Sequence, residues 1–237
     1  MLPRAVWDEL RATAGEVIVN TRGWDWALLQ SRFRARPSIS DVTTPCPTKR
    51  DVYLRRILGM RMESQALETG RKVHEAFMAP FKGEEKEYED PLLKRVYEEA
   101  KLRKLESEQE GIPVSVEPEI PGSPIGLSST IKPDFLVGFM PVEVVYGGNG
   151  SLERKKIAVT GYALALESWI GLPVDAAVII NVTNKKTYWN VVRIHEGLRR
   201  KFIELRDEVA RILAEKEDPG TSEECPSYCP FKEVCKG

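Results

Sequence analysis

The fold of this chain is decided by one stretch, Lys132-Pro-Asp-Phe-Leu-Val-Gly-Phe-Met-Pro-Val-Glu-Val-Val-Tyr146. β-Branched and apolar residues dominate it, and glycine and proline punctuate it. It therefore predicts two short strands, at 131–137 and 141–146, joined by a turn at the glycine. Two carboxylates, Asp134 and Glu143, interrupt the apolar run. Strands disfavour such residues, so the pair either faces water at the strand ends or binds a divalent cation.

The composition is that of a soluble globular protein, with 42% hydrophobic and 30% charged residues. A chain of this length can bury a substantial core, as one large domain or as one domain with an appendage. No run of about 18 apolar residues occurs, and the amino terminus has no signal-peptide core, so we expect a cytoplasmic protein with no membrane partner. The amino-terminal third is basic, and Lys49, Arg50 and Arg55 within it suit either a polyanionic partner or a solvated helix face.

Periodicity predicts a mixed α/β protein. Besides the two strands above, we expect helices at 4–16, 48–59, 62–78, 91–109, 152–169 and 196–217, and strands at 114–119, 174–182 and 187–194. The helix at 48–59 would start at Pro47, because proline suits the first helical position. We divide the chain into a helical region at 1–110, a core at 111–217 and a tail at 218–237, packed as one compact unit.

Two further features of the amino-terminal half have competing interpretations. His74 lies one helical turn after Gly70, which leaves room beside the imidazole, but a lone histidine on a helix is more often structural than a metal ligand. Trp24 and Trp26 share a loop, where they either pack against the domain or stack on bases.

The carboxyl-terminal tail carries three of the four cysteines, in the run Cys225-Pro-Ser-Tyr-Cys229-Pro-Phe-Lys-Glu-Val-Cys235. A secreted disulfide framework is unexpected without a signal peptide. Four thiolates favour one metal centre, in which Cys46 would clamp the amino-terminal region to the tail. Zinc sites usually space paired cysteines by two residues, whereas three and five separate these, so iron–sulfur is preferred and zinc is the alternative.

Taken together, these features resemble a known family. The features that carry the resemblance are Gly70-Arg-Lys-Val-His74, Asp134, Glu143, a later helix with Tyr162, and the four cysteines. In this order they resemble the CRISPR-associated RecB-like nucleases, the iron–sulfur branch of the PD-(D/E)xK superfamily. The Gly23-Trp24 loop and the segment Cys46-Pro-Thr-Lys-Arg-Asp-Val-Tyr53 are similar to its archaeal type I-A subgroup. The similarity covers about residues 20–237.

The resemblance implies a restriction-endonuclease-like mixed sheet flanked by helices, with a metal site and a cluster. The implied ligands of Mg²⁺ or Mn²⁺ are the side chains of His74, Asp134 and Glu143 and the carbonyl of Val144. Such a cation polarises the scissile phosphate and lowers the pKa of an attacking water. Tyr162 would contact the nucleic acid or support the site. The implied cluster ligands are Cys46, Cys225, Cys229 and Cys235, and we expect [4Fe–4S] rather than [2Fe–2S].

The chain departs from the family pattern at two positions. The lysine expected two residues after Glu143 is Val145, and the glutamine expected one helical turn before the tyrosine is Ala158. The lysine normally orients the attacking water and stabilises charge on the phosphate. A lysine from the next helix, Lys155 or Lys156, can replace it, and we favour Lys156.

Three functions follow. The first is a metal-dependent DNA exonuclease that processes single-stranded DNA or overhangs for CRISPR spacer acquisition, together with the integrase subunits. The second is a catalytically weak or inactive DNA-binding iron–sulfur subunit of the same machinery. The third is a zinc-stabilised nucleic-acid module unrelated to CRISPR, which metal content alone would distinguish.

Overall fold

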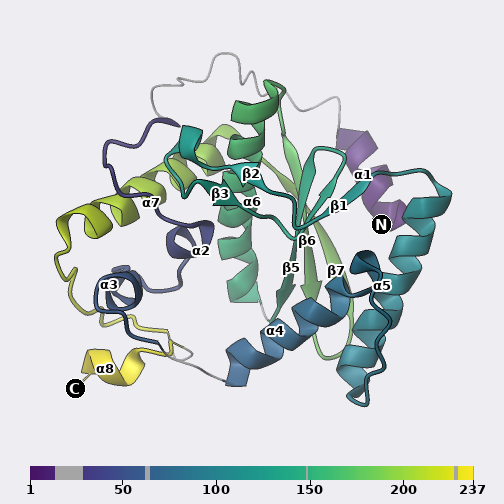
Figure 1. The fold of residues 1–237 in the computed structure, drawn as a ribbon, viewed down its shortest axis with the longest axis horizontal. Coiled ribbons are helices and arrows are strands. Elements are labelled where there is room, and N and C mark those ends of the chain that lie inside the picture. Colours follow the sequence, from purple (N-terminus) through teal and green to yellow (C-terminus); the bar gives the residue numbers. More distant parts are fainter. Residues whose placement is uncertain (14–28, 62–64, 148, 227–228, 237) are drawn as a thin grey trace.

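The computed structural model describes residues 1–13, 29–61, 65–147, 149–226 and 229–236. A five-stranded sheet lies at its centre, in the order β1-β4-β5-β6-β7 (Figure 1). Its strands are β1 (Val114–Val116), β4 (Phe135–Val137), β5 (Met140–Tyr146), β6 (Ala176–Val182) and β7 (Thr187–Arg193). β5 and β6 are parallel and the other neighbouring pairs are antiparallel. The predicted mixed sheet is therefore confirmed.

Helices cover both faces of this sheet, as predicted. The helices are α1 (Arg4–Thr13), α2 (Ile39–Val42), α3 (Arg50–Arg56), α4 (Gln65–Met78), α5 (Pro91–Gln109), α6 (Asn149–Ile170), α7 (Glu196–Glu215) and α8 (Lys232–Lys236). One core lies between the sheet and α6, α7 and α2, and a second lies between the sheet and α1, α4 and α5. Along β5, Val142 and Val144 join the second core and Val145 joins the first. This alternation is the period of a strand that is buried on both faces.

α6 is the crossover helix that connects the parallel strands β5 and β6. From the sequence, the small residues of this helix are expected to let it lie close to a sheet. Gly161 shows where this matters, because a Cβ there would overlap the Phe202 ring of α7 and lie 2.6 Å from Ile39 of α2. Glycine thus permits the close approach of α6 to α7 and α2, rather than to the sheet.

Two predicted elements differ from the structure. The strand expected at 131–137 is interrupted, because Ile131 belongs to β3 (Thr130–Ile131), which pairs with β2 (Ile120–Pro121), and β4 begins only at Phe135. The helix expected from Pro47 begins instead at Arg50. Lys49 stands at its N-cap with φ 62°, a left-handed conformation that ends any helix before it.

The other predicted helices and strands agree with the structure within a few residues, whereas α2, α8 and β2 were not predicted. Two short 3₁₀ turns, η3 (Pro80–Lys82) and η4 (Ser123–Ile125), were not predicted. The predicted residues Trp24 and Trp26 lie outside the described ranges, and the three-region division of the chain stays a prediction. Of the helices in the described ranges, none has both the length and the apolar character needed to cross a membrane.

Candidate functional site

The β4–β5 hairpin brings the two predicted carboxylates together. Phe135 pairs with Val142 across the hairpin. Asp134 and Glu143 occupy the next position on each side, so they lie side by side just beyond that pair. A two-residue turn that begins at Gly138, with φ 62°, sets this register.

His74 and the backbone of Val144 hold the two oxygens of Asp134. His74 Nε2 lies 2.8 Å from Asp134 Oδ1, and the Val144 N–H donates to Oδ2 at 2.7 Å. Burial opposes the charged imidazole, but the hydrogen bond and the charge of Asp134 outweigh it and raise the His74 pKa. A Cβ at Gly70 would meet nothing within 4 Å. His74 therefore does not need the space that this glycine was expected to provide.

Glu143 is the buried carboxylate of the pair, with 3% of its surface exposed. Burial, and then the charge of Asp134, raises its pKa. The ammonium of Lys155 contacts Glu143 Oε2. Burial opposes the charge of Lys155, but the two carboxylates outweigh it and raise the Lys155 pKa. The hydroxyl of Tyr162 lies beside Glu143, and burial together with the charges of Glu143 and Asp134 raises the Tyr162 pKa, so the phenol stays protonated.

Lys155, and not Lys156, is the lysine beside Glu143. Lys156 instead pairs with Glu153 on the exposed side of α6, with Nζ 2.6 Å from Oε1. At about 100° per helical residue, Lys155 and Tyr162 are seven residues apart and share a face within about 20°, whereas Lys156 is rotated from Tyr162 by about 120°. The expected placement of Lys156 beside the carboxylates thus differs from the structure, because a separation of six residues does not give a shared helical face, and which lysine acts in cleavage stays a prediction.

Val145 fills the position of the family's motif lysine and is buried in the core under α6 and α7. Ala158 of α6 lies in the same core. Side chains two apart on a strand share a face, so Glu143 and Val145 both point toward α6. Lys155 comes from the helix that covers this face, so its ammonium can reach the Glu143 carboxylate from α6 instead of from β5.

A cavity of about 290 Å³ opens beside His74. Its walls mix basic and acidic side chains and come from α4, the segment after it and the end of β1: Arg71, His74, Glu75, Met78, Lys82, Glu84, Lys86 and Glu117. Lys82 Nζ lies 2.6 Å from Glu117 Oε2. The Glu117 N–H donates to the Asp134 carbonyl at 2.9 Å, so this wall is tied to the carboxylate pair. The open approach to His74 is therefore polar.

The four cysteines are free thiols, and three of them share one apolar cluster in the tail region. Cys229, with 7% of its surface exposed, packs in it with Leu54 of α3, and Cys225 and Cys235 border it. Burial, together with the neighbouring thiols of Cys225 and Cys46, raises the pKa of Cys229 to about 11. Figure 1 shows α8, which carries Cys235, beside α3. The structure thus brings the predicted cluster ligands to one region.

Within the described residues, no three His, Cys, Asp or Glu side chains already form a group able to hold a metal ion. At the hairpin, His74 pairs directly with Asp134, and Lys155 pairs with Glu143. The donor types nevertheless fit the expected metals, because carboxylate oxygens suit Mg²⁺ or Mn²⁺ and gathered thiols suit iron–sulfur or zinc. Both metals stay proposals.

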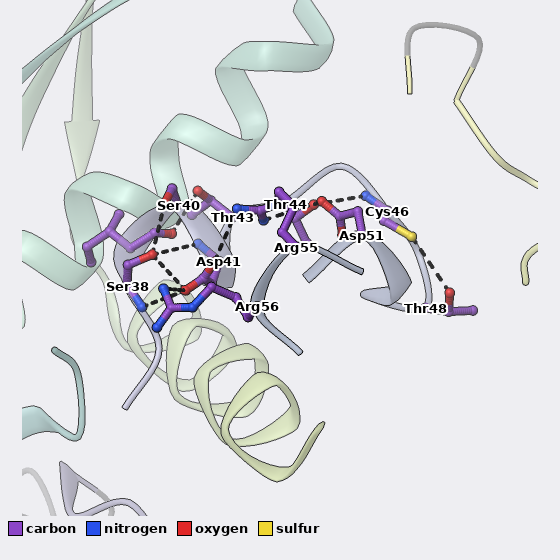
Figure 2. Close-up of polar contacts among 11 residues, drawn as sticks. Ser38, Ser40, Asp41, Thr43, Thr44, Cys46, Thr48, Asp51, Arg55 and Arg56 are labelled. Atoms are coloured by element: carbon purple, nitrogen blue, oxygen red, sulfur yellow. Dashed lines mark hydrogen bonds and ion pairs between the residues drawn. The ribbon is translucent and has the colours of Figure 1, made fainter. Parts of the chain in front are cut away.

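Two buried carboxylates near Cys46 were not singled out from the sequence. Figure 2 shows Asp41, which accepts from Arg56 Nη1 at 2.9 Å, and Asp51, which accepts from the Thr44 hydroxyl. Thr44 Oγ1 in turn accepts from the Cys46 N–H at 3.4 Å. Acidic residues in an otherwise basic segment were the signal that could have identified this network, which orders the chain around the first cysteine.

The basic residues expected to contact DNA phosphates are buried or paired with carboxylates. Lys49 is buried, with 7% of its surface exposed. Arg50 Nη2 lies 2.8 Å from Asp218 Oδ2, and Arg55 Nη1 lies 3.4 Å from Asp41 Oδ1. Lys49 is therefore not on a solvated face, Arg50 and Arg55 already have carboxylate partners, and contact of these residues with phosphates stays a prediction.

Comparison with known proteins gives relatives of one kind. The CRISPR-associated exonuclease Csa1 of Thermoproteus tenax is 28% identical over 127 residues, which are 52% of this chain and 44% of that protein. The Saccharolobus solfataricus protein of the same name is 30% identical over 128 residues, with the same shares. The chain therefore spans less than half the length of the curated relatives that it matches. The alkaline exonuclease LHK-Exo from Laribacter hongkongensis covers 75% of this chain and 84% of its own, at 14% identity, but its TM-score of 0.41 is too low to carry an argument.

A family model gives the broader match. It is described as CRISPR-associated exonuclease Csa1, and it matches residues 4–95 and 92–237. These ranges contain the histidine, both carboxylates and all four cysteines on which the resemblance rests. The family that the sequence resembles is thereby confirmed, and the chain belongs to the CRISPR-associated exonuclease Csa1 family.

Proposed function

We propose that this protein is a metal-dependent DNA nuclease with its site at His74, Asp134 and Glu143. The observation that carries the proposal is the convergence of one imidazole and two carboxylates from separate elements, with the ammonium of Lys155 at the same point. Mg²⁺ or Mn²⁺ bound there would polarise the scissile phosphate and lower the pKa of the attacking water. The exonuclease names of the family and of its two relatives support the same chemistry.

The protein's own side chains would orient this reaction. The Val144 N–H fixes Asp134 from one side and His74 fixes it from the other, while the Val144 carbonyl is the proposed backbone ligand. Tyr162, protonated and beside Glu143, would donate to the second carboxylate and orient it. Lys155 would supply the positive charge beside the phosphate that the motif lysine supplies in the family pattern.

DNA would approach from the polar cavity beside His74. Arg71 lies three residues before His74 on α4, so the two side chains occupy the same helical face. A guanidinium at this place suits a backbone phosphate next to the scissile one. The proposed substrate is single-stranded DNA or a duplex with an overhang.

The wider role rests on the family name. We propose that the protein trims DNA for CRISPR spacer acquisition in the cytoplasm, with the integrase subunits as partners. The four cysteines would hold an iron–sulfur cluster, [4Fe–4S] in preference to [2Fe–2S], that fastens the tail to α3. Zinc is the alternative metal for the same thiols.

A second candidate function is a DNA-binding subunit of the same machinery that does not cleave. One observation favours it: Lys155 already neutralises Glu143, and Val145 leaves the motif position without a cation. A lysine held by the carboxylate competes with a divalent ion for the same oxygens.

One experiment separates the two candidates. The full chain, purified without oxygen, is incubated with end-labelled single-stranded and overhang DNA, with and without Mn²⁺. A nuclease degrades the labelled DNA only when metal is present. Asp134→Asn should lose this activity, whereas Glu153→Gln, which changes an exposed carboxylate on α6, should retain it. Metal-independent binding with no degradation in any divalent cation would favour the non-cleaving subunit.

A further inference from the structure

Arg50 of α3 contacts both ends of the cysteine-bearing tail. Its Nε donates to Asp218 Oδ1 at 2.9 Å, and its Nη2 donates to Asp218 Oδ2 at 2.8 Å. The same guanidinium lies beside the Cys235 sulfur, and Asp218 first and Cys235 second raise the Arg50 pKa. Arg50 also lies four residues after Cys46. One side chain thus links the start of the tail, its last cysteine and the neighbourhood of the first cysteine.

A second tie lies beside this one. The Thr48 hydroxyl donates to the Gly220 carbonyl at 2.9 Å, and the Gly220 N–H donates to Asp218 Oδ1 at 2.9 Å. The Asp218 carboxylate is therefore held both by the turn that follows it and by the guanidinium. A forked arginine–carboxylate pair of this kind fixes direction as well as distance. Only 18% of the Arg50 side chain is exposed, so the pair is partly shielded from water.

We propose that Arg50 is a positioning residue of the cysteine centre. By holding Asp218 and Cys235 at α3, it keeps both ends of the 218–235 segment in place, so that Cys225 and Cys229 meet Cys46 without first closing a free loop. Closing a loop costs conformational entropy, and a segment whose ends are already held loses less of it when a metal binds. This inference rests on the metal centre proposed above, and it removes Arg50 from the DNA-binding surface.

The test uses the full chain, purified without oxygen. Arg50→Gln removes the guanidinium on α3, and Asp218→Asn removes the charge of its partner in the tail. If Arg50→Gln merely damaged the fold of α3, Asp218→Asn would not share its effect. Arg200→Gln is the matched control, because Arg200 Nε and Nη2 both donate to Glu196 Oε1 on the exposed side of α7. The measurements are iron and sulfide per chain and the rate at which a chelator removes the visible absorbance.

Arg50→Gln and Asp218→Asn are each expected to lose the cluster about tenfold faster than the parent, the size of one charge-assisted hydrogen bond. The double variant should lose it no faster than Arg50→Gln alone, because Asp218→Asn removes a contact that Arg50→Gln has already removed. Arg200→Gln should match the parent. Parental rates in both single variants, or fully additive effects in the double variant, would overturn the proposal.

A second measurement does not depend on iron. In protein stripped by chelator, amide hydrogen exchange over 218–236 should be faster in Arg50→Gln than in the parent, since the tail ends are released. Arg50→Lys should behave like Arg50→Gln, because lysine keeps the charge and loses the fork. Full rescue by lysine would make the effect one of charge and refute positioning. If the parent holds zinc or no metal, the iron–sulfur proposal fails while the exchange comparison still decides the role of Arg50.

Discussion

Replacing Lys155 with alanine should slow DNA cleavage and at the same time leave metal binding intact or tighter. Lys155 contacts the buried oxygen of Glu143, and its ammonium also lies in the field of Asp134. Its removal leaves two neighbouring carboxylates without this cation. An added divalent ion then meets less competition for their oxygens, but the phosphate loses a nearby positive charge.

The magnitude of the rate effect follows from the proposed role. A preorganised group aimed at developing charge is worth about 10²–10³ in rate, or roughly 3–4 kcal/mol of transition-state stabilisation. Lys156→Ala is the matched control, because its partner Glu153 has 72% of its side chain exposed. Such a surface pair contributes at most about 1 kcal/mol to stability and nothing to a site it does not touch, so the rate should stay within about twofold of the parent.

The assay is single-turnover cleavage of end-labelled DNA in saturating Mn²⁺, paired with calorimetric titration of Mn²⁺ into each variant. Opposite signs for rate and metal affinity in Lys155→Ala are the expected signature. If Lys155 were merely structural, its replacement would lower both the cleavage rate and the affinity for Mn²⁺. If Lys156→Ala lost cleavage while Lys155→Ala cleaved at the parental rate, the reasoning from helical phase and the contact at Glu143 would be refuted.

Three other outcomes can be measured directly. Cys46→Ser should remove iron and colour from anaerobically purified protein as fully as replacement of a tail cysteine does, and stoichiometric zinc in the parent would contradict the iron assignment. Arg199→Met should destabilise the fold by about 3–5 kcal/mol in chemical denaturation, because the fully buried guanidinium pairs with two carboxylates that would be left unpaired, and an unchanged midpoint would contradict this. Gly161→Ala should cost about 1–3 kcal/mol by overpacking against α7. Gly70→Ala, where a Cβ meets open space in α4, should instead stabilise by about 0.5–1 kcal/mol, and equal effects at both glycines would refute the packing argument.

Local patterns in the sequence were enough to predict the β4–β5 hairpin and its paired carboxylates. The turn at Gly138 and the runs of β-branched and apolar residues define both strands within a short segment, so no distant contact is needed to place Asp134 beside Glu143. The long helices α5 and α7 were predicted for the same reason, since their ends and periodicity are local. α2 was missed because it is only four residues long and is defined by a capping box between Ser38 and Asp41 rather than by periodicity.

The partners of the charged residues could not be predicted from local sequence patterns. Arg50 and Asp218 are 168 residues apart in the chain, and nothing in the composition of either segment indicates that they meet. The basic amino-terminal segment therefore suggested contacts to nucleic acid, whereas the fold pairs Arg50, Arg55 and Arg56 with carboxylates of this chain. Lys155 is a different case, because its separation of seven residues from Tyr162 already predicts that the two side chains share a face of α6.

The candidate site depends on both layers of the protein. His74 comes from α4 on one side of the sheet, Lys155 and Tyr162 come from α6 on the other, and the hairpin supplies the carboxylates between them. The carboxylate pair is formed by local contacts, but its imidazole and ammonium arrive only when both helices pack against the sheet. Uncompensated carboxylates at a buried position disfavour the folded state, and each helix brings a group that offsets this cost. The same packing that stabilises the sheet thus assembles the proposed metal site, so loosening either helix is expected to impair cleavage before the hairpin itself is lost.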